Sequence, residues 1–178
     1  PRSIKGKLED LGMRPDFLQM VKDQLAKPTG AVLTTGPTGS GKTLIGEYAI
    51  HRAIRQQRRV FYTTPLKALS NQKYRDFCGE FGEDNVGLLT GDISINRDAP
   101  IVVMTTEIFR NMLYGTRIGE VGTSMIGVEA VVLDECHFMN DRERGTDVTL
   151  FSPTAGAMGH HLEDRVILNG KKTVVFTN

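Results

Sequence analysis

The sequence predicts an α/β fold in which helices cover both faces of a mainly parallel sheet, giving three layers. Short apolar runs rich in β-forming residues alternate along the 178-residue chain with segments of helical periodicity. A glycine-rich loop follows the first apolar run and leads directly into a helical pattern. Strands joined by helices need right-handed crossovers, which leave the strands parallel. With 39% hydrophobic residues, we expect one domain over residues 1–178, with a lead-in at 1–30 and a core at 31–178.

The individual elements follow from local signals. A first helix is expected from Asp16 to Lys27, because Pro15 suits its first turn and the sequence Pro-Thr-Gly ends it. Its apolar stripe of Phe17, Leu18, Val21 and Leu25 is expected to pack against the sheet. A second helix follows the glycine-rich loop and ends at about Gln57, and a third covers residues 66–77. The expected strands are 31–35, 60–63, 86–89, 101–104, 128–133 and 173–176.

The glycine-rich loop matches the full phosphate-binding pattern G-x-x-x-x-G-K-[ST], placed between a strand and a helix. Its glycines let backbone N–H groups close around phosphate oxygens, and the helix N-terminus adds the positive end of its dipole. Lys42 is expected to reach the β and γ phosphates, and the Thr43 hydroxyl to bind Mg²⁺. A glycine-rich turn without a ligand is the disfavoured alternative. The expected nucleotide-binding residues are Gly36, Pro37, Thr38, Gly39, Ser40, Gly41, Lys42 and Thr43.

A second chemical centre lies where the apolar strand 128–133 ends in adjacent carboxylates. A buried strand of this kind can deliver Asp134 to the Mg²⁺ held by Thr43, while Glu135 polarises the water that attacks the γ phosphate. Paired acids at a strand end are often a solvated turn, but the phosphate loop upstream favours catalysis. His137 is the weaker catalytic candidate, because an isolated histidine is more often structural.

The segment Asp134-Glu135-Cys136-His137 resembles the DExH box of superfamily-two helicases. Blocks at 63–74, 88–96 and 104–114 resemble those of the Ski-type RNA helicases, and the match over residues 42–146 is similar to cyanobacterial and chloroplast members. The resemblance implies a RecA-like P-loop NTPase domain that binds ATP or ADP with Mg²⁺ and contacts the backbone of single-stranded RNA. We expect that binding to be weak, because the chain would provide only half of the RNA-binding cleft. Charged groups and loop N–H groups can make such sequence-blind contacts. The implied RNA-binding residues are Pro65, Lys67, Thr90, Gly91, Thr105, Thr106 and Arg110.

The two ends of the chain depart from that pattern. Residues 11–43 resemble the approach to the phosphate loop in type II secretion and type IV pilus ATPases, while Gln19 stands at the distance expected of an adenine-binding glutamine. After Gly145 the tryptophan and glutamates of the Ski-type continuation are missing, and Thr177 stands near the place of an absent Ser-Ala-Thr motif. These three dissimilar segments suggest a chimeric, recombined or designed domain.

The favoured function is therefore the first RecA-like domain of a Ski-type DExH RNA helicase. That class completes its ATP site with arginines from a second RecA-like domain, for which 178 residues leave no space. Since an arginine finger is worth about 10³–10⁵ in rate, we expect slow or no hydrolysis and no unwinding, so enzymatic activity stays open. A secretion-type or pilus-type ATPase module, and a designed fold that keeps at most nucleotide binding, are the alternatives.

Composition adds limits on partners and location. A net charge of +1 does not mark a nucleic-acid binder, and we interpret the basic cluster at Arg52, Arg55, Arg58 and Arg59 as a solvated helix end rather than an RNA patch. Cys78 and Cys136 suit reduced thiols, and no apolar run could span a membrane, so the cytoplasm or the chloroplast stroma is expected. His160 and His161 lack a third ligand, which leaves Mg²⁺ as the expected metal. The oligomeric state stays open.

Overall fold

The computed structural model describes residues 14–27, 30–35, 42–114, 126–135 and 172–177. Seven strands in this part of the chain form one sheet with the order β1-β7-β6-β2-β5-β3-β4. Every pairing is parallel except that of β3 with β4. The strands are β1 (Gly30–Thr35), β2 (Arg59–Thr64), β3 (Val86–Leu89), β4 (Ser94–Ile95), β5 (Ile101–Thr105), β6 (Val128–Leu133) and β7 (Lys172–Thr177).

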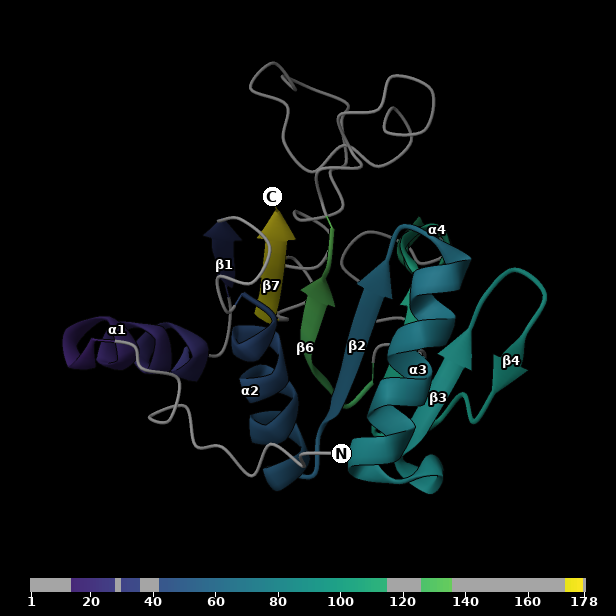
Figure 1. Ribbon diagram of the computed structural model, residues 1–178, viewed down its shortest axis with the longest axis horizontal. Helices are drawn as coiled ribbons and strands as arrows, with labels where there is room; N and C mark the ends of the chain where they lie inside the picture. The colour runs from purple at the N-terminus through teal and green to yellow at the C-terminus, as the bar shows by residue number, and fades with distance from the viewer. Residues whose placement is uncertain (1–13, 28–29, 36–41, 115–125, 136–171, 178) are drawn as a thin grey trace, which may run out of the picture.

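Helices cover both faces of this sheet, so the predicted three-layer α/β fold is confirmed (Figure 1). Side chains of α1, α2 and α3 pack on one face, and those of α4 pack on the other. A short 3₁₀ turn, η2 (Glu83–Asn85), joins α3 to β3. The helices are α1 (Pro15–Ala26), α2 (Lys42–Arg55), α3 (Lys67–Phe81) and α4 (Thr106–Tyr114).

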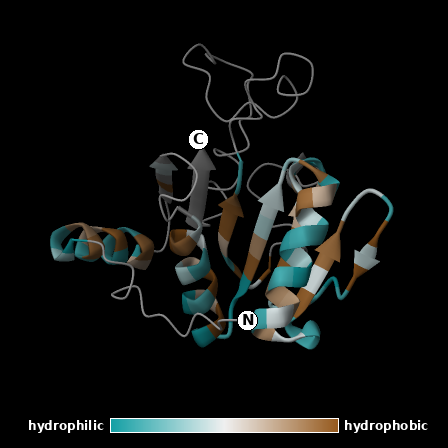
Figure 2. Ribbon diagram, viewed as in Figure 1, coloured by the Kyte–Doolittle hydropathy of each residue, from teal (hydrophilic) through white to brown (hydrophobic). Residues whose placement is uncertain are grey.

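The central strands divide the core into two clusters because successive side chains of a strand point to opposite faces. On β2, Tyr62 lies in the cluster beneath α2 and α3, whereas Phe61 lies in the cluster beneath α4. Phe61 meets Phe109 of α4 edge to face, with 6.2 Å between ring centroids. The hydrophobic colouring of β6 in Figure 2 is that of an inner strand buried on both faces. The core thereby holds the carboxyl ends of these strands in register.

Most expected elements match the structure within two residues at each end. The third helix is longer than expected, since α3 continues to Phe81. The sequence analysis assigned neither α4 nor β4, which has only two residues. The expected packing of the first helix is wrong at one position: Phe17 is 42% exposed, while Val21 and Leu25 are buried. Phe17 lies in the first turn of α1, at the end of the stripe that is farthest from the buried Leu25.

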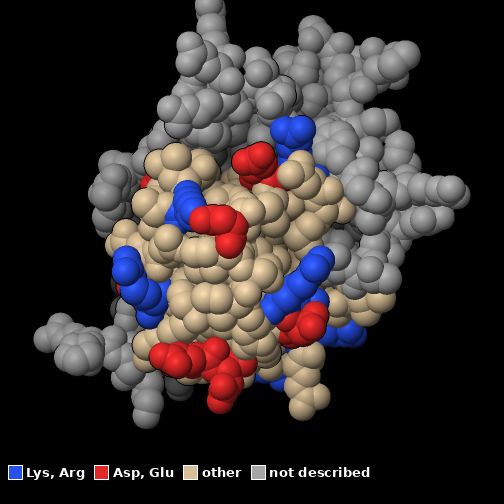
Figure 3. Space-filling model, turned by 90° about the vertical axis from the view of Figure 1, so that its right-hand side faces the viewer, with Lys and Arg blue, Asp and Glu red and all other residues tan. Residues whose placement is uncertain are grey.

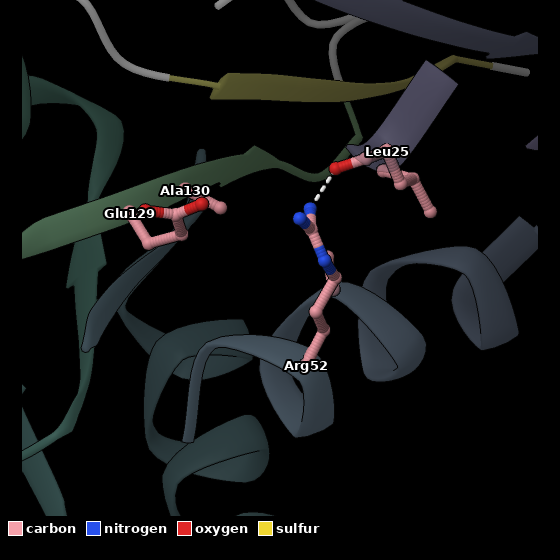
Figure 4. Close-up of a pocket in the computed structure, with 5 residues that line it drawn as sticks. Leu25, Arg52, Glu129 and Ala130 are labelled. Carbon is pink, nitrogen blue, oxygen red and sulfur yellow. Dashed lines mark hydrogen bonds between the residues drawn. The ribbon is translucent and has the colours of Figure 1, made fainter. Parts of the chain in front are cut away.

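Two arginines of the basic cluster have structural partners, which corrects their interpretation as a solvated helix end. The Arg52 guanidinium donates to the carbonyl oxygens of Leu25 and Ala26 and so caps the last turn of α1. Figure 4 shows the bond to Leu25. Arg59 donates to the carbonyl oxygens of Arg97 (2.8 Å) and Ala99 (3.2 Å). The Arg52 contacts join α2 to α1, and the Arg59 contacts join β2 to the loop before β5.

The pocket beside Arg52 is too small for a ligand. It has a volume of about 10 Å³ and is lined by Leu25, Ala49, Arg52, Glu129 and Ala130, and a space of that size holds a water molecule at most. Among the described residues, no helix is both long and apolar enough to cross a membrane.

Candidate functional site

The candidate site lies along the edge of the sheet where its parallel strands end. The arrowheads of β1, β7, β6, β2 and β3 point to this edge in Figure 1, which is where ligands bind in open α/β sheets. The phosphate loop at 36–41 and His137 lie outside the described residues, as does the side chain of Lys42. The described part of the site therefore consists of the start of α2 and the residues that follow the strands.

The N-terminus of α2 provides one side of the site. Thr43 lies half-buried in its first turn, directly after the phosphate loop. The first turn contains no acidic side chain, so the positive end of the helix dipole has no carboxylate partner in that turn. An anionic phosphate is the ligand that suits such an end.

Asp134 follows β6 and is held at three atoms. Its backbone N–H donates to the carbonyl oxygen of Thr63 on β2 at 2.9 Å, which continues the sheet by one residue. The carboxylate accepts a hydrogen bond at each oxygen: Oδ2 from the Tyr62 hydroxyl at 2.6 Å and Oδ1 from the Glu135 N–H at 2.9 Å. An ionised carboxylate has about four lone-pair sites, so two remain for a metal ion.

Glu135 has an unusual backbone conformation. Its φ of +56° lies in the left-handed region, which costs a residue with a Cβ roughly 1–2 kcal/mol. Strain of this kind is typical of functional positions, where the required side-chain direction overrides the local preference. Its side chain is half-buried. The conformation supports a functional role for Glu135, as its position after the strand suggested.

Tyr62 belongs to the site although the sequence analysis treated it only as part of a strand. Its ring is fully buried, and its burial, followed by the charge of Asp134, raises the pKa of the hydroxyl well above the usual value of 10. The phenol therefore stays protonated and acts as the donor. The available signal was chemical: a tyrosine in a buried strand needs a partner for its hydroxyl.

The donor atoms present suit magnesium. The Thr43 hydroxyl and the Asp134 carboxylate are hard oxygen ligands, and protein Mg²⁺ sites often use one or two such side chains with substrate phosphates and water. No group of three or more histidines, cysteines or acids is arranged for a metal in the described ranges. The described residues thus fit a metal ion shared with a phosphate ligand better than a metal cage built by the protein alone.

The residues expected to bind RNA lie along the other half of the same edge. Pro65 is in the turn between β2 and α3, where the buried Thr64 hydroxyl donates to the Leu66 carbonyl oxygen (3.1 Å) and bonds Ser70 (2.8 Å). Thr105 is paired in register with Thr64. This turn is therefore held firmly beside the end of β5. The neighbouring Thr106 is only 6% exposed and Arg110 of α4 is half-buried.

Lys67 and Thr90 share a partner that the sequence analysis did not identify. The Lys67 ammonium forms an ion pair with Asp92, and the Thr90 hydroxyl donates to the other carboxylate oxygen at 3.2 Å. The hydrogen bond from Lys67 holds the pKa of Asp92 below its usual 3.8. Gly91, between these residues, is exposed and has no atom within 4 Å of the place of a Cβ. Two expected phosphate contacts are thus engaged by a carboxylate.

Gln19, the expected adenine-binding glutamine, lies on an exposed face of α1. It is far in the sequence from the residues described above. Its side-chain amide donates to Asp23 at 2.7 Å, which is the spacing of one helical turn. The face of the molecule near β3 and β4 carries basic side chains that stand apart from one another, with acidic ones between them (Figure 3). Any contact of this face with nucleic acid therefore depends on single residues rather than on a basic patch.

Comparison with known proteins relates most of the chain to one family. The model of the family described as DEAD/DEAH box helicase matches residues 18–175. The chain is 54% identical over 127 residues to the protein named DExH-box ATP-dependent RNA helicase DExH15 chloroplastic of Arabidopsis thaliana, covering 69% of this chain and 11% of that protein. It is 53% identical over 130 residues to ATP-dependent RNA helicase mtr4 of Schizosaccharomyces pombe, covering 73% of this chain and 11% of the relative.

Two further similarities complete the comparison. The chain is 51% identical over 130 residues to the probable helicase HelY of Mycobacterium tuberculosis, covering 73% of this chain and 14% of that protein. The structure of the Pyrococcus furiosus Hef helicase domain superposes with a TM-score of 0.53 at 22% identity, covering 93% of this chain and 34% of the other, and supports the fold alone. The secretion-ATPase resemblance of residues 11–43 and the chimeric origin stay predictions.

Proposed function

Because the chain belongs to the DEAD/DEAH box helicase family, we propose that it is the N-terminal motor domain of a DExH-box RNA helicase. In this proposal it binds ATP and ADP with Mg²⁺, hydrolyses ATP slowly or not at all alone, and does not unwind duplexes. The chain spans 11–14% of the relatives compared above, so the activity of a complete helicase would need further segments. The chloroplastic relative supports the chloroplast stroma as an alternative to the cytoplasm.

The observation that carries the nucleotide proposal is the fixed carboxylate of Asp134. Buried strand β6 ends directly before this residue, and the hydrogen bonds to its two oxygens leave lone pairs free at the edge from which α2 starts. Bound Mg²⁺ would supply charge neutralisation at the phosphates. Asp134 and Thr43 would hold that ion, and Glu135 would orient the attacking water by accepting its proton.

The RNA-binding half of the proposal rests on the segments after β2, β3 and β5. The segments after β2 and β3 are turns, and the one after β5 is the start of α4. Together they place backbone groups and hydroxyls at one edge of the sheet, which suits contacts to phosphate and sugar without base readout. Because Lys67 is paired with Asp92, a phosphate would have to replace that carboxylate. We therefore expect weak binding with little sequence preference.

A nucleotide titration tests the proposed site. The parent protein should bind a fluorescent ATP analogue in the presence of Mg²⁺, and Lys42→Ala should abolish binding because the phosphates lose their cation. Arg55→Ala is the matched control, since Arg55 is an exposed cation in the last turn of the same helix. Equal affinity of the parent and Lys42→Ala would refute the site.

Glu135→Gln separates binding from turnover. The substitution removes a proton acceptor but keeps the size of the side chain, so residual hydrolysis should fall while nucleotide affinity is kept. The measurements are phosphate release and equilibrium binding on the same sample. Parallel losses of rate and affinity would place Glu135 among the ligands of the nucleotide instead.

Fluorescence anisotropy with a labelled single-stranded RNA homopolymer tests the nucleic-acid interface. Lys67→Ala/Arg110→Ala should weaken binding and flatten the logarithmic salt slope by roughly 0.7 for each lost phosphate contact, measured between about 50 and 200 mM salt. Arg55→Ala/Arg58→Ala removes two exposed cations from the opposite end of the sheet and should leave the slope unchanged. Binding that is insensitive to the first pair, or lost with the second, would contradict the assigned interface.

A further inference from the structure

The contact between Tyr62 of β2 and Asp134 after β6 joins two residues that are 72 positions apart in the sequence. We propose that Tyr62 is a positioning residue that sets the orientation of the Asp134 carboxylate for Mg²⁺. The proposal rests on the proposed function, because it assumes that Asp134 binds the metal ion of a bound nucleotide. It adds a residue that the motif pattern of the phosphate loop and the acidic strand end does not contain.

The ring of Tyr62 is fixed from several sides, which makes its hydroxyl a stationary donor. The side chain is fully buried between the sheet and the helices of one face. Phe77 of α3 meets the ring edge to face at 5.1 Å between centroids, and the Lys73 ammonium lies 5.6 Å from the ring centroid. Since a tyrosine has only two side-chain torsions and both are restricted here, the position of the hydroxyl follows from the packing of α3 on β2.

Asp134 in turn has its carboxylate plane determined by two donors. Tyr62 holds Oδ2 at 2.6 Å and the Glu135 N–H holds Oδ1 at 2.9 Å. The second of these donors is local and would persist without the first. The Tyr62 hydroxyl therefore decides whether the carboxylate can rotate about its last torsion. With both donors present, the unused lone pairs of the Asp134 carboxylate point in one fixed direction. The binding of a metal ion then does not have to restrict the rotation of this carboxylate.

Hydrogen-bond partners of metal ligands have measurable effects on metal affinity. Removing such a partner usually lowers the affinity for the metal by about ten- to a hundredfold. Tyr62→Phe removes only the hydroxyl and keeps the ring that packs against Phe77. The expected defect is therefore one in Mg²⁺ binding and not in the fold. Tyr74→Phe is the matched control, because Tyr74 lies on α3 and packs against the same core cluster, whereas the hydroxyl that donates to Asp134 is that of Tyr62.

The test is a Mg²⁺ titration of the binding of a fluorescent ATP analogue. The Mg²⁺ concentration at half-saturation should rise at least about tenfold in Tyr62→Phe and stay at the parent value in Tyr74→Phe. Affinity for the analogue in EDTA should be the same in all three proteins. General damage to the domain would instead lower this affinity too. An unchanged Mg²⁺ requirement in Tyr62→Phe, or an equal loss of affinity in EDTA, overturns the proposal.

A second measurement needs no nucleotide. A double-mutant cycle of Tyr62→Phe and Asp134→Ala, followed by urea unfolding, should show non-additive effects because both substitutions remove the same hydrogen bond. Additive effects would overturn the proposal.

If the parent binds no nucleotide, the proposed function fails and the metal-positioning role fails with it. If the parent binds normally and only the Tyr62→Phe result is negative, the positioning role alone is refuted.

Discussion

The replacement of Gly87 by alanine tests how the β3–β4 segment is held against the sheet. Gly87 lies in β3, and a Cβ at this position would be 2.2 Å from the carbonyl oxygen of Asn96 and 3.0 Å from that of Ile95. Both atoms belong to the backbone, so rotation of a side chain cannot relieve the contact. Either β3 or the segment that returns from β4 must move.

The expected cost follows from what that movement breaks. Overpacking that shifts backbone costs about 1–3 kcal/mol. The Asn96 carbonyl oxygen accepts from the Ala99 N–H at 3.0 Å, and disturbing this bond adds about 0.5–1.5 kcal/mol. Alanine restricts the unfolded chain more than glycine does, which offsets about 0.4–1 kcal/mol of this destabilisation. The net destabilisation should be about 1–3 kcal/mol.

Gly79 provides the opposite case within the same domain. It lies in the last turn of α3, and no atom is found within 4 Å of the place of its Cβ. Gly79→Ala should therefore stabilise the protein by about 0.5–1 kcal/mol through helix propensity.

Equilibrium unfolding in urea separates the two substitutions. With a slope of about 2 kcal/mol per molar, the midpoint should fall by about 0.5–1.5 M in Gly87→Ala and rise slightly in Gly79→Ala, with unchanged slopes. A midpoint for Gly87→Ala at or above that of the parent would refute the close approach of Asn96. If Gly79→Ala were less stable than the parent, the space around position 79 could not be open as described.

Three further substitutions test contacts described above. Asp92→Asn should strengthen binding of single-stranded RNA and steepen its salt slope by about 0.7, because Lys67 becomes available for one more phosphate; an unchanged slope by anisotropy contradicts this. Glu47→Gln should be more stable than the parent at pH 7, because burial, followed by a neighbouring acid, raises the pKa of Glu47 above 4.5. Ionised Glu47 is thus unfavourable above that pH, and the difference in urea midpoint should vanish as the pH falls below 4.5; the same difference at both pH values argues against it. Arg52→Met should destabilise the docking of α1 by about 1–3 kcal/mol and speed its amide exchange, unlike the exposed Arg55→Met; equal exchange in the two variants would exclude the capping role.

Local patterns predicted much of this fold. The strand bounds at 86–89 and 128–133 match the structure, because buried parallel strands are continuous apolar runs that end abruptly in polar residues. The elements that were missed have weak local signals. Strand β4 has only two residues, and α4 begins directly at the end of β5, so that no turn residue separates them. Phe17 was assigned to the core because helical spacing identifies a stripe but does not show how far the covering surface extends.

Spacing along the chain was enough to predict the order of strand, phosphate loop, helix and acidic strand end, and with it the three-layer fold and the residues proposed for nucleotide binding. These features depend on short-range spacing, which is visible along the chain. The partners of three functional or charged residues became visible only in the folded chain: Asp92 for Lys67, the last turn of α1 for Arg52, and Tyr62 for Asp134. Such pairs join segments 25–72 positions apart. They depend on strand order and on the packing of helices against the sheet, neither of which periodicity records.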